Sequence, residues 1–368
     1  MANRIHIRPK SLLALLALAV LPILAACGTV DSAQTTINPQ SDVAREIQGT
    51  YAFIFWVSVV VFVVVEGALV YAVFRYRRRA NSGIPKQTEG NMVLEVTWTI
   101  IPALILVAIA VPTWITIFRT DDIPEGSFIV NITGHQWWWE VEYPELRTGE
   151  GDTEVRLVTA NEIRVPADRT IGFHLETNDV LHSFWVPQLF GKVDLVPGRT
   201  NTVWFTPDAD TVGEVFLGQC VEFCGLSHAN MRMRIFIDSP DDFAAWADGI
   251  RSPAPEATGL AATGHELFSS KGCTVCHSVN GDYEAAGQPL SGGRILIGPN
   301  LTGFGSRTTL AGAILENNTE NLATWLAEPD EVKPGNLMYQ EAAAYTQPEL
   351  SLANEDVTAL VAYLQHLQ

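Results

Sequence analysis

GQCVEFCGLSHANM, residues 218–231, places two cysteines, a glutamate, a histidine and a methionine within the twelve positions from Cys220 to Met231. A disulfide between Cys220 and Cys224 can form outside the cell, but it does not account for His228 and Met231. Zinc can bind two cysteines and two histidines, but a thioether is not among its usual ligands. Copper accepts thiolate, imidazole and thioether together, and two cysteines in one loop can bridge two copper ions. Such a pair requires a second histidine from outside the loop.

The sequence around this loop has the pattern of short β-strands from Ser127 to about Asp238. The segments SFIVNIT, EVRLV, TIGFHLE, TNTVWFT and MRMRIFID alternate apolar and polar residues or are rich in β-branched residues, and Pro and Gly turns separate them. This pattern predicts a β-sandwich or barrel. Three histidines in the region are candidates for the second ligand. We favour His182, beside a Pro-bearing turn, over His174 on a polar stripe and His135 at the start of GHQWWWEVEY.

The C-terminal third contains KGCTVCHS, with the C-x-x-C-H signature of c-type haem attachment. In this signature Cys273 and Cys276 form thioethers to the haem, and His277 reaches the iron. A zinc or redox C-x-x-C would leave the histidine unexplained. Met338, in the loop KPGNLM, is the predicted second axial ligand, and a Met/His pair raises the haem potential.

Helical patterns dominate this third of the chain, which predicts a small all-α domain over residues 260–368. His366 and His265 are the alternatives to methionine as the second haem ligand. The stretch SPAPEATGLAATG, residues 252–264, is rich in Pro, Ala and Gly and indicates a linker, which we place at residues 241–259 before the helical domain.

The N-terminus has the features of an export signal. Three basic residues precede the apolar run SLLALLALAVLPILAA, and the ending LAAC resembles a bacterial lipobox. We interpret residues 1–26 as a lipoprotein-type signal peptide and Cys27 as the lipidated mature N-terminus; a plain signal peptide with an incidental cysteine is the alternative.

Two apolar segments, about 51–71 and 96–118, are long enough to span a bilayer. They form a predicted transmembrane α-hairpin within residues 27–119, and Pro102 and Pro112 are expected to bend the second span. The connecting stretch RYRRRANSGIPK has five basic residues in twelve and is expected to stay in the cytoplasm. The predicted location is therefore the bacterial cytoplasmic membrane, multi-pass, with the C-terminal domains on the outer face.

The net charge of −18 is unevenly distributed. Residues 1–118 carry 9 basic and 6 acidic side chains (net +3), and residues 119–368 carry 14 and 35 (net −21). A chain this acidic is a poor candidate for binding nucleic acid, whose affinity depends on phosphate neutralisation. The acidic surface serves either solubility or attraction of a cationic protein partner.

Residues 45–238 resemble subunit II of the haem–copper cytochrome c oxidases. The resemblance rests on HSFWVP, GHQWWW, GKVDLVPGR and the loop C-S-E-x-C-G-x-x-H-x-x-M, in which Val221 replaces serine here. Residues 260–368 resemble class I cytochromes c. In that domain GPNL (298–301) matches the loop on the histidine side of the haem, and Tyr339 replaces the proline that usually follows the distal methionine.

These resemblances imply a cupredoxin-like β-sandwich or Greek-key barrel over residues 120–240, followed by a cytochrome c domain. The implied cofactors are a dinuclear copper A centre, covalent haem c, and magnesium bound by the Glu222 side chain at the interface with subunit I. Trp137 is implied to receive electrons from cytochrome c, and Glu95 to lie at the mouth of a proton channel. The implied copper ligands are His182, Cys220, Cys224, His228, Met231 and the carbonyl of Glu222.

The expected function is subunit II of a bacterial terminal cytochrome c oxidase. Electrons from the fused haem pass through the copper centre to subunit I, which reduces oxygen to water and pumps protons. Expected partners are subunit I, subunit III and an upstream donor, either a cytochrome c or a quinol–cytochrome c reductase complex. The alternatives are a quinol oxidase subunit II (which lacks copper ligands), a membrane-anchored copper and haem electron carrier outside any oxidase, and a zinc–cytochrome lipoprotein.

The two external segments are both acidic: residues 119–254 have a net charge of −12, and residues 255–368, with 4 basic and 13 acidic side chains, have −9. They are not expected to associate by electrostatic attraction. A short tether supplies an effective concentration of order mM instead. Electron transfer between the two centres is therefore predicted to be nearly insensitive to salt.

Overall fold

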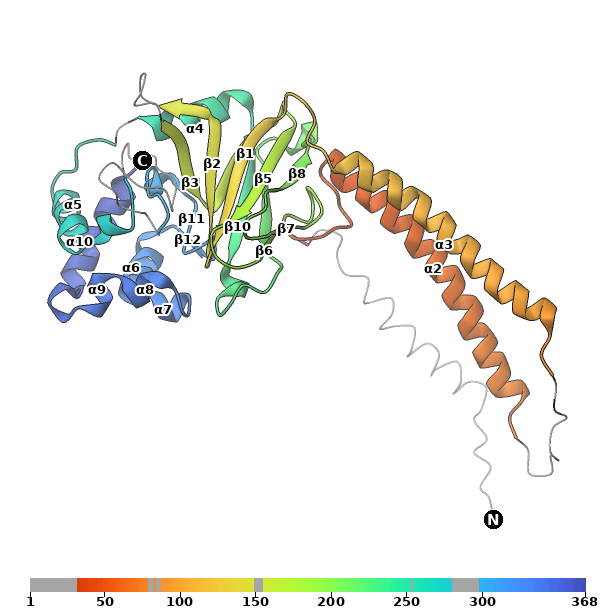
Figure 1. The fold of residues 1–368 in the computed structure, drawn as a ribbon. Helices are drawn as coiled ribbons and strands as arrows, with labels where there is room; N and C mark the ends of the chain where they lie inside the picture. Colours follow the sequence, from red (N-terminus) through yellow and green to blue (C-terminus); the bar gives the residue numbers. More distant parts are fainter. Residues whose placement is uncertain are drawn as a thin grey trace, which may run out of the picture.

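The computed structural model describes residues 32–78, 83, 87, 89–148, 155–252, 254–279 and 298–368. In chain order these residues form two long helices, a β-sandwich and a helical C-terminal domain, and the sandwich lies between the other two parts (Figure 1). The expected signal segment 1–26 and Cys27 lie outside the described residues.

Helices α2 (Asp42–Arg75) and α3 (Met92–Thr120) project together from one end of the sandwich (Figure 1). Both are long and apolar enough to cross a membrane, and each extends beyond the apolar segment expected from the sequence. Near the sandwich they are joined by a 2.7 Å contact between the hydroxyls of Thr50 and Thr116. Helix α3 contains Pro102 and Pro112 without an interruption.

The start of α2 is attached to the sandwich, which fixes the two long helices to this domain. Ser41 caps the helix by accepting from the amide of Ala44, and its hydroxyl donates to the carbonyl of Leu189 at 2.5 Å. The carboxylate of Asp42 accepts from the amide of Thr206 at 2.8 Å.

Two five-stranded sheets make up the sandwich, with strand orders β3-β2-β1-β5-β8 and β4-β10-β9-β6-β7. The alternation in TIGFHLE correctly predicts which side chains face inward, because Ile171, Phe173 and Leu175 are fully buried. The first sheet consists of β1 (Phe128–His135), β2 (Trp138–Thr148), β3 (Val155–Ala160), β5 (Ile171–Thr177) and β8 (Asn201–Phe205). The second consists of β4 (Glu162–Pro166), β6 (His182–Trp185), β7 (Val193–Leu195), β9 (Val215–Cys220) and β10 (Arg232–Asp238).

The segment expected to be a linker, 241–259, begins instead with a helix. Helix α4 (Pro240–Arg251) has Ser239 as its N-cap, whose side chain accepts from the amide of Asp242. Phe243, Ala247 and Ile250 are spaced four and three residues apart, so they share one face and are buried. The prediction of a linker overlooked this helical spacing, because it was based on the Pro and Ala content of the residues that follow. Residues 254–258 have no regular secondary structure.

The C-terminal domain is helical, as the sequence predicts, and its core is formed where α5 (Leu260–Ser270) crosses α10 (Asn354–His366). Gly264 permits this crossing, because a Cβ there would collide with the carbonyl oxygen of Ala359. The remaining elements are the helices α6 (Thr319–Ala327), α7 (Pro329–Val332), α8 (Leu337–Glu341) and α9 (Ala343–Thr346), and the short strands β11 (Thr309–Leu310) and β12 (Leu315–Glu316).

Candidate copper and haem sites

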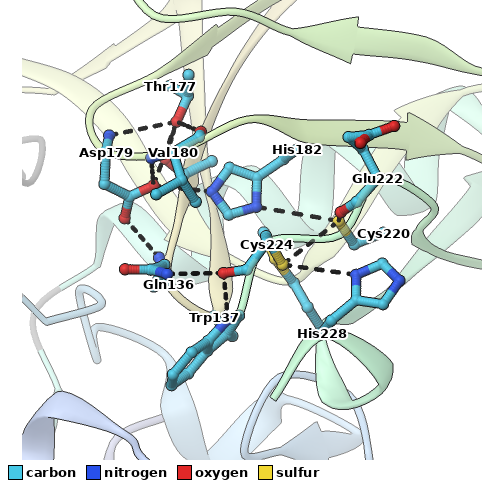
Figure 2. A network of polar contacts seen from close by, with 12 residues as sticks. Gln136, Trp137, Thr177, Asp179, Val180, His182, Cys220, Glu222, Cys224 and His228 are labelled. Carbon is cyan, nitrogen blue, oxygen red and sulfur yellow. Dashed lines mark hydrogen bonds and ion pairs between the residues drawn. The ribbon is translucent and has the colours of Figure 1, made fainter. Parts of the chain in front are cut away.

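Five side chains from two parts of the sandwich converge at one end of the second sheet. His182 begins β6, Cys220 ends β9, and Cys224, His228 and Met231 come from the loop between β9 and β10. The two thiol sulfurs are 3.7 Å apart. Nδ1 of His182 lies 3.9 Å from the sulfur of Cys220, and Nδ1 of His228 lies 3.6 Å from that of Cys224 (Figure 2). The thioether sulfur of Met231 is 3.9 Å from the sulfur of Cys224.

These separations fit ligands that share metal ions. Two ligand atoms bound tetrahedrally at about 2.0–2.3 Å from one ion lie roughly 3.3–3.8 Å apart. The carbonyl oxygen of Glu222 lies 3.2 Å from the sulfur of Cys220, while its side chain is exposed. Two thiols, two imidazoles and a thioether form a donor set suited to copper. The residues present therefore fit a dinuclear copper centre.

The two thiols do not ionise equally without a metal. The hydrogen bond from Cys224 lowers the pKa of Cys220 to about 4, and His182 contributes to this shift. The pKa of Cys224 is raised, first by its hydrogen bond to Cys220 and then by burial. The charge of Cys220 adds to this shift, because two adjacent thiolates repel. Binding of a cation therefore releases the proton of the second thiol.

Asp179 orients the ring of His182. One of its carboxylate oxygens accepts from Nε2 of His182 at 2.8 Å, which leaves Nδ1 facing Cys220. The same carboxylate accepts from the amides of Gln136 at 2.7 Å and Val180 at 2.6 Å (Figure 2). Burial opposes ionisation of Asp179, yet these hydrogen bonds lower the pKa of its carboxyl. Burial likewise opposes the charge on His182, but Asp179 and Cys220 raise its pKa.

The other two histidine candidates lie away from the thiols. Nδ1 of His174 is 3.2 Å from the side-chain oxygen of Asn131, on the outer face of the first sheet. The ring of His135 stacks on Trp138, with 4.3 Å between ring centroids. The preference for His182 as the second histidine therefore agrees with the geometry.

Trp137 contacts the thiol loop directly. Its Nε1 donates to the carbonyl oxygen of Cys224 at 2.9 Å, and Nε2 of Gln136 donates to the same oxygen at 2.6 Å (Figure 2). Trp137 is 8% exposed, whereas Trp139, two positions later, is fully buried in the sandwich core. Trp137 also lines a mainly apolar cavity between the sandwich and the C-terminal domain.

This cavity brings together the residues of the predicted haem site. Cys273, Cys276, His277 and Met338 line it, and Trp137 reaches it from the sandwich. Nδ1 of His277 donates to the carbonyl oxygen of Pro299 at 2.8 Å, which leaves Nε2 available to a metal. Burial lowers the pKa of His277, so the neutral, ligating form is favoured. An apolar cavity with these side chains fits a covalently attached haem.

The alternative haem ligands do not line this cavity. His265 packs against the ring of Tyr363, with centroids 5.1 Å apart. Nε2 of His366 lies 2.9 Å from the carbonyl oxygen of Pro255. Met338 is therefore the better-placed partner of His277.

Two polar residues at these sites, Asp179 and Lys333, are ordinary loop residues in sequence, and nothing in the sequence points to their positions. Gln136 lies in the motif GHQWWW, but its hydrogen bond to the carbonyl oxygen of Cys224 was not expected. Lys333 is 4% exposed, and burial lowers its pKa to about 7. Its Nζ donates to the carbonyl oxygen of Trp137. Glu95 lies in the first turn of α3, far along the chain from both sites.

Comparison with known proteins identifies the three parts of the chain. Residues 32–115 match the transmembrane domain of cytochrome c oxidase subunit II, residues 128–239 match its periplasmic domain, and residues 261–368 match cytochrome c. The expected cupredoxin-like sandwich and cytochrome c domain are thereby confirmed.

Curated relatives cover nearly the full length. The chain is 37% identical over 342 residues to cytochrome c oxidase subunit 2 of Alkalihalophilus pseudofirmus, with 91% of each chain covered. It is 35% identical over 370 residues to that of Bacillus subtilis, covering 96% of this chain and 97% of the relative. The solved periplasmic domain of subunit II from Bradyrhizobium japonicum is 31% identical, with a TM-score of 0.30, over 34% of this chain and 95% of that one. The chain belongs to the cytochrome c oxidase subunit II family, with a cytochrome c domain at its C-terminus.

Proposed function

We propose that this chain carries electrons from its own c-type haem, through a dinuclear copper centre, to subunit I of a terminal oxidase. His182, Cys220, Cys224, His228, Met231 and the carbonyl of Glu222 hold the copper pair in this proposal. Cys273, Cys276, His277 and Met338 hold the haem. When bound, the two groups supply one-electron redox chemistry at a positive potential.

The contact of Trp137 with both sites carries this proposal. The indole donates to the carbonyl oxygen of Cys224, a proposed copper ligand, and lines the cavity that holds Met338 and His277. One side chain therefore lies between the two redox sites. This position supports the role of Trp137 as the residue through which electrons leave the haem.

The chain's own residues keep the copper site rigid. Asp179 fixes the ring of His182, and Gln136 and Trp137 fix the backbone of Cys224. The amide of Cys220 donates to the carbonyl of Met231 at 2.9 Å, which closes the loop. A site held this way changes little between oxidation states, which suits a relay that works at small driving force.

The remaining roles are part of the same proposal. The helices α2 and α3 span the cytoplasmic membrane of a bacterium, Cys27 carries a lipid, and both redox domains lie on the outer face. The exposed carboxylate of Glu222 binds magnesium at the interface with subunit I, and Glu95 lies at a proton-channel mouth. Subunit III and an external donor complete the assembly, in which subunit I reduces oxygen and pumps protons.

The test is purification of the tagged full chain from its native membrane under mild detergent. We expect it to bring down a large haem-bearing subunit, and the complex to consume oxygen when the c-type haem is reduced. A chain that purifies alone, loaded with copper and haem but without oxygen uptake, would favour the membrane-anchored carrier instead.

A further inference from the structure

A buried lysine of the cytochrome domain (residues 260–368) contacts the backbone of Trp137. Nζ of Lys333 donates to the carbonyl oxygen of Trp137 in the copper domain (residues 120–240) and, at 3.0 Å, to that of Ala311 in its own domain. Because both acceptors are carbonyl oxygens, the amine can make these two bonds whether it is charged or neutral. One side chain therefore joins the two domains at the residue between the two redox sites.

The surroundings of Lys333 are closely packed against the copper domain. Gly312, at φ +82°, leaves room for Lys333, because a Cβ there would collide with Nζ. Gly335, at φ +77°, lies against the copper domain, and a Cβ there would meet Leu226 at 2.9 Å and the indole of Trp137 at 3.3 Å. Both positions need glycine for close approach as well as for backbone conformation.

Hydrogen bonds between the two domains surround this contact. The hydroxyl of Ser227 donates to the carbonyl oxygen of Pro334 at 2.7 Å, and the amide of Arg232 donates to that of Gly312 at 3.1 Å. These bonds connect the segment that carries Cys224 and His228 with Pro334, the residue after Lys333, and with Gly312, the residue after the Ala311 carbonyl that Lys333 contacts. The interface is thus built on the copper loop itself.

A second buried side chain anchors the interface from the opposite domain. Glu162, at the start of β4, is 7% exposed. Its carboxylate accepts from the amide and hydroxyl of Thr308 at 3.2 and 2.7 Å, and from the hydroxyl of Thr309 at 2.5 Å. A carboxylate with several donors is well compensated for burial.

The loop that carries Lys333 also positions the proposed haem ligand. Asn336 donates to the carbonyl oxygen of Lys333 at 2.8 Å and to that of Pro329 at 3.0 Å, and accepts from the amide of Tyr339 at 2.9 Å. These bonds fix residues 333–339 as one unit, with Met338 inside it. The position of Lys333 on Trp137 is therefore linked to the position of Met338 in the haem cavity.

We propose that Lys333 and Glu162 are positioning residues that lock the cytochrome domain onto Trp137, so that the haem cavity is held beside this residue in one fixed arrangement. The inference rests on the proposed function, because it concerns the path from haem to copper. Because both domains are acidic, they repel each other at long range. The buried short-range contacts hold the domains together against this repulsion. An external donor then cannot reach Trp137 and must deliver its electrons to the haem.

The test compares Lys333→Met and Glu162→Gln with a matched control, Lys192→Met, in the full chain loaded with copper and haem. Lys192 is an exposed lysine of the copper domain, directly before strand β7. Hydrogen exchange is followed at two amides that donate across the interface, Arg232 and Thr308, and at Leu301, which donates within the cytochrome domain at 2.8 Å. The rate of electron transfer from haem to copper is measured on the same samples.

Either interface variant should raise the hydrogen-exchange rate at Arg232 or Thr308 about tenfold or more, because loss of a buried hydrogen bond shifts the opening equilibrium of the interface by that order. The exchange rate at Leu301 should stay unchanged, and electron transfer from haem to copper should become slower. The control should change neither. Wild-type exchange and transfer rates in both variants would overturn the inference. Glu162→Gln keeps the test decisive if Lys333→Met fails to take up haem, since it alters no residue of the cytochrome domain. Absence of haem-to-copper transfer in the wild type would count against the proposed function, while the exchange rates would still decide the roles of Lys333 and Glu162.

Discussion

Replacing Asp179 with asparagine is expected to weaken copper binding without removing a ligand. Both carboxylate oxygens of Asp179 accept hydrogen bonds, one from Nε2 of His182 and the other from the amide of Gln136. An asparagine has one oxygen and one NH2 group, so one of these donors must face another donor in either orientation. If the NH2 group faces His182, the imidazole is no longer held with Nδ1 toward Cys220.

The size of the effect follows from these contacts. Loss of a group that orients a ligating histidine typically reduces metal affinity by about 10–100-fold, or roughly 1.4–2.7 kcal/mol. A buried donor left without an acceptor costs about 1–3 kcal/mol of stability, so the metal-free protein should also unfold more easily. All five ligand side chains remain, so copper stoichiometry at saturation should be unchanged.

The assay is a competition titration with a copper chelator of known affinity, together with chemical unfolding of the metal-free protein. Asp194→Asn is the matched control, because Asp194 is an exposed residue of the neighbouring strand β7. The control should bind copper like the wild type. Wild-type copper affinity in Asp179→Asn would refute the argument that this carboxylate positions His182.

Three further predictions test the path between the sites. Trp137→Phe removes one hydrogen bond to Cys224, so it should cost only about 1 kcal/mol of stability but slow haem-to-copper transfer, measured by rapid photoreduction; an unchanged rate would mean that electrons bypass the indole. The same transfer should be nearly independent of ionic strength in the wild type, because the interface consists of buried contacts; a steep fall on adding salt would indicate domains that separate and re-associate. Met338→Ala should keep the haem attached through Cys273 and Cys276 but lower its potential in a redox titration, and a wild-type potential would point to another axial ligand.

The sequence was sufficient for the fold class, and the side chains that it proposes as copper and haem ligands lie together in two places in the structure. Ligand side chains with specific chemistry are recognisable in sequence, because few residue types can take their place: two thiols, a nearby histidine and a thioether predict copper. The strands were visible because alternate residues such as Ile171 and Phe173 must be apolar to fill the core of the sandwich.

The helix α4 and the contacts between the two redox domains were not predictable in this way. The apolar face of α4 is short and contains only Phe243, Ala247 and Ile250 as buried residues, beside a Pro- and Ala-rich segment. Lys333 has no sequence pattern that separates it from a solvated surface lysine, since its burial depends on a domain distant in sequence. Charge and composition predicted only that the domains would not attract one another, whereas the structure adds a buried interface that requires no attraction.

The central claim is that the loop with Cys220 and Cys224 holds two copper ions beside a c-type haem. The most direct test measures copper per haem in the purified full chain together with its electron paramagnetic resonance spectrum. Two coppers per haem, with one unpaired electron coupled to both copper nuclei, are the predicted result. One copper, zinc in place of copper, or a spectrum localised on a single nucleus would contradict the account.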